Sequence, residues 1–153
     1  MKITLAVIGL LAGAACPALG ATLVACPAGT PAKNCTFKGD SAIQAAIDKA
    51  ADGDTILVDP GTYYENFNFN GKRLTLTKWM ECDNPVIDGG GVNPAITLLG
   101  TEGQGTSIRG FDLTHGYGAY GGGVCANGAN VQIEQCNFYD NSAGMGGALY
   151  NTK

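Results

Sequence analysis

Two aspartates, Asp88 and Asp112, have the residue type and spacing best suited to chemistry. Shifting the sequence by 24 residues places Ile87-Asp88 over Phe111-Asp112, which predicts that the two carboxylates stack in neighbouring turns of a repeat. Strands stack about 4.8 Å apart, so the pair would match the carboxylates of a retaining glycosidase or supply oxygen ligands to calcium. The alternative is that Asp88, directly before three glycines, only caps a turn through backbone amides.

His115 is the only histidine of the chain. A shift of 25 residues sets it beside Asp140, and Arg109 lies earlier in the same segment. A histidine, a carboxylate and a guanidinium together could transfer a proton on an acidic sugar. The candidate catalytic residues are therefore Asp88, Asp112, His115 and Arg109. The alternative for His115 is a solvated turn, because glycines follow it.

Four further residues are candidates for substrate contact. Asn137 takes the place of Asp112 after the 25-residue shift and should share its outward position. Trp79, Tyr117 and Tyr120 lie in irregular segments, where their rings could form a platform for stacking sugars. The alternative is that some of these aromatic side chains belong to the core.

A repeat of strands is the framework that must position these side chains. The 25-residue shift matches apolar positions of residues 108–116 to those of 133–141, and a 24-residue shift matches 122–127 to 146–151. Short β-type runs separated by glycine and asparagine at this period are typical of a solenoid, in which each coil buries its inner face against its neighbours. The sequence therefore predicts an all-β solenoid with about 24 to 25 residues per coil.

One amphipathic helix is predicted before the strands, from Ser41 to about Ala51. Ser41 and Gln44 form a capping-box pattern at its start. A helix in this place would close the open end of a solenoid, where core and unpaired strand backbone are otherwise exposed. Its apolar residues recur at helical spacing: Ile43, Ala46, Ile47 and Ala50.

The first residues predict a signal peptide over residues 1–20. Lys2 precedes an apolar run over residues 3–15, and small residues follow at 18–20. The run is shorter than the roughly 20 residues that span a bilayer. We therefore expect an exported protein, secreted, periplasmic or at the cell surface, that does not span the membrane.

Export to an oxidising compartment predicts a disulfide between Cys26 and Cys35, which would close the short loop between them. The pairing of Cys82, Cys125 and Cys136 stays open. The chain carries 13 acidic and nine basic residues, and only two of the basic residues are arginines. This balance does not predict a basic patch that could bind a phosphate backbone, and it argues against a nucleic-acid partner.

Two sets of residues resemble a known family. SAIQAAID (41–48), GDTI (53–56), VDPGTY (58–63) and EN (65–66) resemble the opening coil of pectin-lyase-like β-helix proteins. Phe138-x-x-Asn141-Ser142-Ala143-x-x-Gly146-Gly147-Ala148 resembles the repeats of secreted bacterial β-helix proteins. The resemblance implies a right-handed parallel β-helix over residues 38–153, after a short N-terminal segment at 21–37.

The same resemblance implies a polysaccharide partner, bound or processed along the strand face. It leaves open whether the chain is an enzyme, because the superfamily includes lyases, glycoside hydrolases, esterases, epimerases and non-catalytic adhesins. A surface adhesin or passenger-type structural β-helix is therefore the alternative. Calcium is the only cofactor that the candidate residues suggest. No C-terminal cap is visible after Asn151, so we also expect either further coils or end-to-end association.

Overall fold

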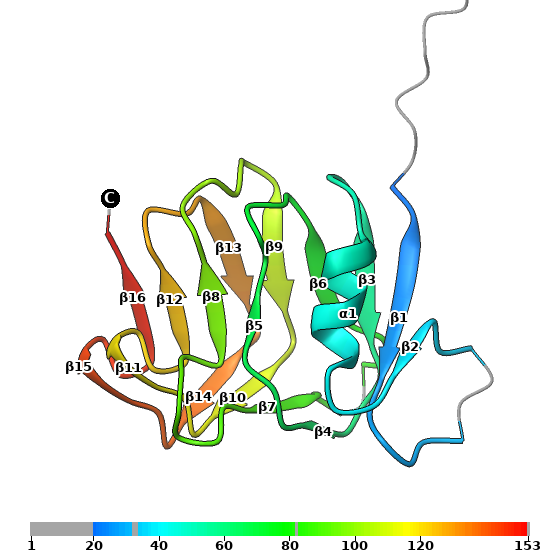
Figure 1. The fold of residues 1–153 in the computed structure, drawn as a ribbon, viewed down its shortest axis with the longest axis horizontal. Helices are drawn as coiled ribbons and strands as arrows, with labels where there is room; N and C mark the ends of the chain where they lie inside the picture. The colour runs from blue at the N-terminus through cyan, green and yellow to red at the C-terminus, as the bar shows by residue number, and fades with distance from the viewer. Residues whose placement is uncertain (1–19, 32–33, 82, 153) are drawn as a thin grey trace, which may run out of the picture.

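The computed structural model describes residues 20–31, 34–81 and 83–152. Residues 1–19 of the expected signal peptide lie outside this part of the chain. Four stretches, which we call passes 1 to 4, cover residues 55–68, 75–98, 106–126 and 131–151. Each pass adds one strand to each of three parallel sheets, and Figure 1 shows the passes side by side from β3 to β16.

Every strand pair in the four sheets is parallel. Sheet A has the order β13 (Val131–Glu134), β9 (Thr106–Arg109), β6 (Thr75–Lys78), β3 (Thr55–Val58), β1 (Thr22–Cys26) and β2 (Phe37–Lys38). Sheet B has the order β14 (Asn137–Tyr139), β10 (Asp112–Thr114), β7 (Val86–Asp88) and β4 (Thr62–Tyr63). Sheet C has the order β16 (Leu149–Asn151), β12 (Val124–Ala126), β8 (Ile96–Leu98) and β5 (Phe67–Asn68), and sheet D pairs β11 (Tyr117–Tyr120) with β15 (Ser142–Met145).

The core lies between the sheets, because alternate residues of each strand point inward. Sheets A, B and C all contribute fully buried side chains to one apolar cluster. The arrangement of mostly parallel strands in stacked sheets with one short helix is compatible with a parallel β-helix, and the predicted all-β class is confirmed. Fully buried side chains of the strands include Ile56, Leu76 and Ile108 from sheet A, Tyr63, Ile87 and Leu113 from sheet B, and Ile96 and Leu98 from sheet C.

Helix α1 (Ala42–Lys49) packs against β1, β2, β3 and β5 at one end of the sheets (Figure 1). It is shorter than predicted, and the predicted capping box is wrong, because Ser41 makes no side-chain cap hydrogen bond. Glu65 replaces it: its two carboxylate oxygens accept the backbone N–H groups of Ile43 and Gln44, both at 3.1 Å. A side chain from pass 1 therefore satisfies the first turn of the helix.

Two more long-range contacts complete this end of the fold. The Lys72 ammonium donates to the carbonyls of Ile47, Asp48 and Ala50 at 2.7 to 2.9 Å, at the C-terminal end of α1. The Gln44 amide pairs with both backbone groups of Asn68, at 2.8 and 3.2 Å. Because β5 is an edge strand of sheet C, Gln44 occupies the backbone groups that another strand could use.

The spacing between passes 3 and 4 is 25 residues throughout, since Val131 lies opposite Thr106 and Leu149 opposite Val124. The predicted 24-residue match of 122–127 to 146–151 is therefore wrong by one residue. Gly121 and Gly146 occupy equivalent bends with φ of 60° and 66°. Glycine adopts the left-handed backbone of both bends without steric cost. The ladder has the same 25-residue period before and after the bends.

The expected disulfide between Cys26 and Cys35 is confirmed, with a Cα–Cα distance of 5.8 Å. Among the described residues, Cys125 and Cys136 carry free, half-buried thiols. The described residues also include no helix of a length and apolar character suited to crossing a membrane.

Candidate functional site

The predicted stacking of Asp88 on Asp112 is wrong by two residues. Val86 lies opposite Asp112, and Asp88 lies opposite Thr114. The connection between β8 and β9 (99–105) is longer than its counterpart between β12 and β13 (127–130). The offset between β7 and β10 is therefore 26 residues, from Val86 to Asp112, and the 24-residue shift fails there. The two carboxylates consequently do not form the stacked pair that motivated the glycosidase and calcium interpretations. Over residues 20–31, 34–81 and 83–152, no group of three or more His, Cys, Asp or Glu side chains could hold a metal ion.

Asp112 instead lies in a polar network at the start of β10. Its Oδ1 accepts hydrogen bonds from the amides of Asn84, at 2.9 Å, and Asn137, at 2.8 Å. Asn84 in turn accepts a bond from the Lys78 ammonium at 3.2 Å. The predicted equivalence of Asp112 and Asn137 is confirmed, because they lie opposite each other in the ladder. Sequence reasoning missed Asn84 and Lys78, because neither lies in a segment that the shifts matched.

His115 contacts Asp88 from the preceding pass. Its Nδ1 lies 3.1 Å from Asp88 Oδ2, while Asp88 Oδ1 accepts the backbone N–H of Gly90 at 2.9 Å. The turn-capping alternative for Asp88 is therefore correct, and the same carboxylate also orients a histidine. Asp140 is the equivalent of His115 one pass later, since both have a left-handed backbone with φ near 50°. Because a carboxylate can only accept a hydrogen bond, a bond in this contact takes its proton from Nδ1.

Tyr139 is the aromatic side chain that completes this outer face of sheet B. It lies opposite Thr114, whose buried Oγ1 has no hydrogen-bond partner among the described residues. Desolvation, followed by the negative charges of Asp112, Asp140 and Asp88, raises the pKa of Tyr139. Three carboxylates therefore lie near Tyr139 on this side of the molecule.

Arg109 lies in a groove of about 290 Å³ on the outer face of sheet A, across β6, β9 and β13. The register aligns its lining side chains in two rows at right angles to the strands. Arg109 Nε also donates to Gln135 Oε1 at 3.0 Å. The first row is Thr75, Ser107 and Gln132, and the second is Thr77, Arg109 and Glu134.

The predicted aromatic residues lie on different elements. Tyr117 and Tyr120 are both exposed on β11, whereas Trp79 follows β6. One of them, Tyr120, pairs with Tyr150, with ring centroids 4.8 Å apart. Sequence reasoning missed Tyr150, because only the parallel pairing of β11 with β15 and β12 with β16 brings it close.

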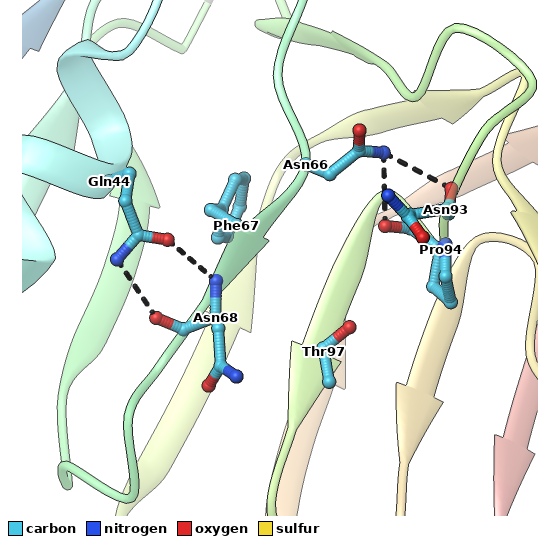
Figure 2. Close-up of a pocket in the computed structure, with 7 residues that line it drawn as sticks. All are labelled: Gln44, Asn66, Phe67, Asn68, Asn93, Pro94 and Thr97. Carbon is cyan, nitrogen blue, oxygen red and sulfur yellow. Dashed lines mark hydrogen bonds between the residues drawn. The ribbon is translucent and has the colours of Figure 1, made fainter.

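A depression of about 210 Å³ lies between α1 and the loop that precedes β8 (Figure 2). Figure 2 shows Gln44 and Asn68 on one side, Asn66 with Asn93 on the other, and Thr97 below them. Phe67 and Pro94 supply the remaining walls. Sequence reasoning missed this site, because its residues come from three segments that lie apart in the sequence.

Comparison with known proteins finds no matching family model, no matching curated protein and no matching solved structure. The likeness to pectin-lyase-like proteins therefore depends on the residues of the opening motif and on the parallel strand arrangement. Neither the fold class nor the opening motif assigns an activity.

Proposed function

We propose that the chain is a secreted, pectin-lyase-like β-helix protein that binds polysaccharide along the outer face of sheet A. The observation that carries the proposal is the groove across β6, β9 and β13, lined by hydroxyl, amide, guanidinium and carboxylate groups. Within each row, equivalent side chains recur about every 4.8 Å, a spacing comparable to that of successive sugar units. Such groups can donate to and accept from sugar hydroxyls along an extended chain.

Arg109 provides the sharpest test of this groove, because Arg73 is a matched control. Both arginines are exposed, but Arg73 precedes β6 and does not line the groove. We expect Arg109→Ala to weaken binding by about tenfold, the effect of losing a charge-assisted hydrogen bond worth roughly 1.4 kcal/mol. Arg73→Ala should leave the affinity unchanged.

Affinity electrophoresis through gels containing polygalacturonate, alginate or a neutral glucan would measure this difference. If no polymer retards the protein, or both arginine variants behave alike, the groove is not a polysaccharide site. The alternative of a structural or adhesive β-helix, which requires no sugar groove, would then be favoured.

Proton transfer by His115 is a second candidate function, favoured by its contact with Asp88. A carboxylate that fixes the imidazole tautomer is the arrangement a general base requires. If the protein cleaves one of these polymers, His115→Ala and Asp88→Asn should each lower the rate by about 100-fold or more. Asp112→Asn should change it less, because Asp112 is committed to Asn84 and Asn137. Release of reducing ends and unsaturated products would report the activity, and wild-type rates in His115→Ala would contradict this role.

A further inference from the structure

The depression in Figure 2 has the chemistry of a neutral binding site. Its seven lining residues include three asparagines, a glutamine and a threonine, and none of the seven carries an ionisable side chain. A charged ligand would lose its hydration there without gaining a counter-charge. Ligands rich in hydroxyl groups, in contrast, offer both donors and acceptors to amide side chains.

The walls of the depression are held in place by hydrogen bonds to the backbone. The Asn66 amide nitrogen donates to the carbonyls of Gly89, Asn93 and Pro94, each at 3.1 Å. On the opposite side, Gln44 pairs with the backbone of Asn68. A site whose walls are already ordered loses less entropy when a ligand binds.

Several polar groups remain unused once these walls are formed. Asn66 Oδ1, Asn68 Nδ2, the Asn93 side-chain amide and the Thr97 hydroxyl make no hydrogen bond to the described residues, and Asn66 and Asn93 are exposed. The set contains both acceptors and donors. It can therefore satisfy neighbouring hydroxyl groups, which is what a sugar ring presents.

A row of side chains leads from the depression to an aromatic pair. Asn68 lies opposite Thr97, Thr97 opposite Cys125, and Cys125 opposite Tyr150 on the outer face of sheet C. Tyr150 packs against Tyr120 at the far end of the row. Burial raises the pKa of the Cys125 thiol, so the row stays uncharged at neutral pH. Three strand spacings give a length of roughly 14 Å, comparable to three linked sugar rings.

We propose that the outer face of sheet C binds a linear neutral oligosaccharide, with one sugar ring in the amide depression and the chain extending to the Tyr120–Tyr150 pair. Asn93 and Thr97 contact the ring in the depression, and the tyrosine rings stack on the other end of the chain. The site shares no residue with the groove on sheet A. It therefore does not depend on the function proposed for that groove.

Titration of the full chain with maltotriose, cellotriose, mannotriose and laminaritriose, followed by NMR of the side-chain amides, would test the site. We expect at least one trisaccharide to saturate and to shift asparagine resonances. Thr97→Val and Asn93→Ala should each weaken binding about fivefold, the effect of one lost hydrogen bond. Neither side chain bonds to the described protein, and thermal unfolding would verify that both variants fold.

Thr55→Val is the matched control, because Thr55 is a half-buried threonine on β3 that lines neither the depression nor the groove. It should leave trisaccharide affinity unchanged. The proposal is overturned if no trisaccharide binds up to about 10 mM, or if Thr55→Val and Thr97→Val have equal effects. Loss of trisaccharide binding in Arg109→Ala would also overturn the proposal for sheet C, because the ligand would then lie on sheet A. If only the polymer binds, and only to sheet A, the proposal for the groove is retained and the proposal for sheet C is overturned.

Tyr150→Ala tests the direction of the bound chain. This change should weaken the trisaccharide by about threefold or more, the effect of one lost aromatic contact. It should leave binding of the corresponding monosaccharide unchanged, because the single ring occupies the depression. Equal losses for the two ligands, or no loss for either, would overturn the proposed path along sheet C.

Discussion

Passes 3 and 4 repeat every 25 residues, whereas passes 1 and 2 follow no common period. Opposite residues are separated by 20 positions between Thr55 and Thr75 but by 29 between Phe67 and Ile96. The regular passes are held by ladder hydrogen bonds and inward apolar side chains. The irregular passes add hydrogen bonds between residues far apart in the sequence. Glu65 and Lys72 bind the two ends of helix α1, and Gln44 binds the edge strand β5.

This difference shows that the ladder does not require an equal number of residues in each pass. Loops can absorb extra residues as long as the strands stay in register and their inward side chains stay buried. The extra segments in turn create surfaces that the regular passes lack. The depression of Figure 2 is one of these, since Asn93 and Pro94 lie in the link between β7 and β8.

The largest expected effect compares one column of the core in passes 3 and 4. Ile108 is fully buried, and Ile133, directly opposite it, is half-buried on β13. Ile108→Ala should lower the free energy of unfolding by about 4 kcal/mol, because it leaves a cavity. Ile133→Ala should cost about half as much, since part of its surface already contacts water. Urea unfolding would measure both, and equal losses would contradict the observed burial.

A second prediction concerns the pH dependence that Glu65 gives to the irregular end. Burial raises the pKa of Glu65 to about 7, with a smaller contribution from the charge of Asp40, against the helix N–H groups that favour the carboxylate. Its pKa in the unfolded chain is near 4.5, so the folded protein takes up the proton more readily. The stabilising contribution is complete below about pH 4.5 and is lost as the pH rises through 7.

The loss between these limits should be on the order of 3 kcal/mol. Urea unfolding at several pH values, for the wild type and for Glu65→Gln, would measure it. The glutamine does not titrate, so its stability should vary less over this range. If the free energies of unfolding of the wild type and of Glu65→Gln change by the same amount between pH 5 and pH 7, Glu65 has an ordinary pKa.

The smallest expected effects compare two equivalent bends between sheets A and B. Gly110 has a φ of 79°, and Gln135, one pass later, has a φ of 52°. A Cβ at Gly110 would also meet the Lys78 side chain at 2.7 Å. Gly110→Ala should therefore lower the free energy of unfolding by about 2 kcal/mol. Gln135→Gly should change it by less than about 0.5 kcal/mol, because relief of the strained backbone offsets the greater entropy of glycine in the unfolded chain.

Thermal unfolding of both variants would check this pair. The result would be contradicted if Gly110→Ala were neutral, or if Gln135→Gly were the more damaging change. Either outcome would mean that the two bends do not have the same backbone conformation.

Sequence reasoning predicted the regular part of the fold better than the irregular part. The 25-residue match of 108–116 to 133–141 agrees with the ladder, which places Asn137 opposite Asp112. The match of Asp88 to Asp112 failed, because the connection between β8 and β9 is longer than the equivalent connection between β12 and β13. The contact of His115 with Asp88 was missed for the same reason, since a shift in register decides which side chains meet.

The sequence by itself determined the alternation of apolar residues, the period of the last two passes to within one residue, the single helix and the Cys26–Cys35 bridge. Each of these follows from local pattern or from a short separation along the chain. Only the tertiary structure decided which side chain caps α1, which residue orients His115 and which amides surround the depression. These contacts join residues 20 to 30 positions apart, and such pairings depend on loop lengths that no local pattern encodes.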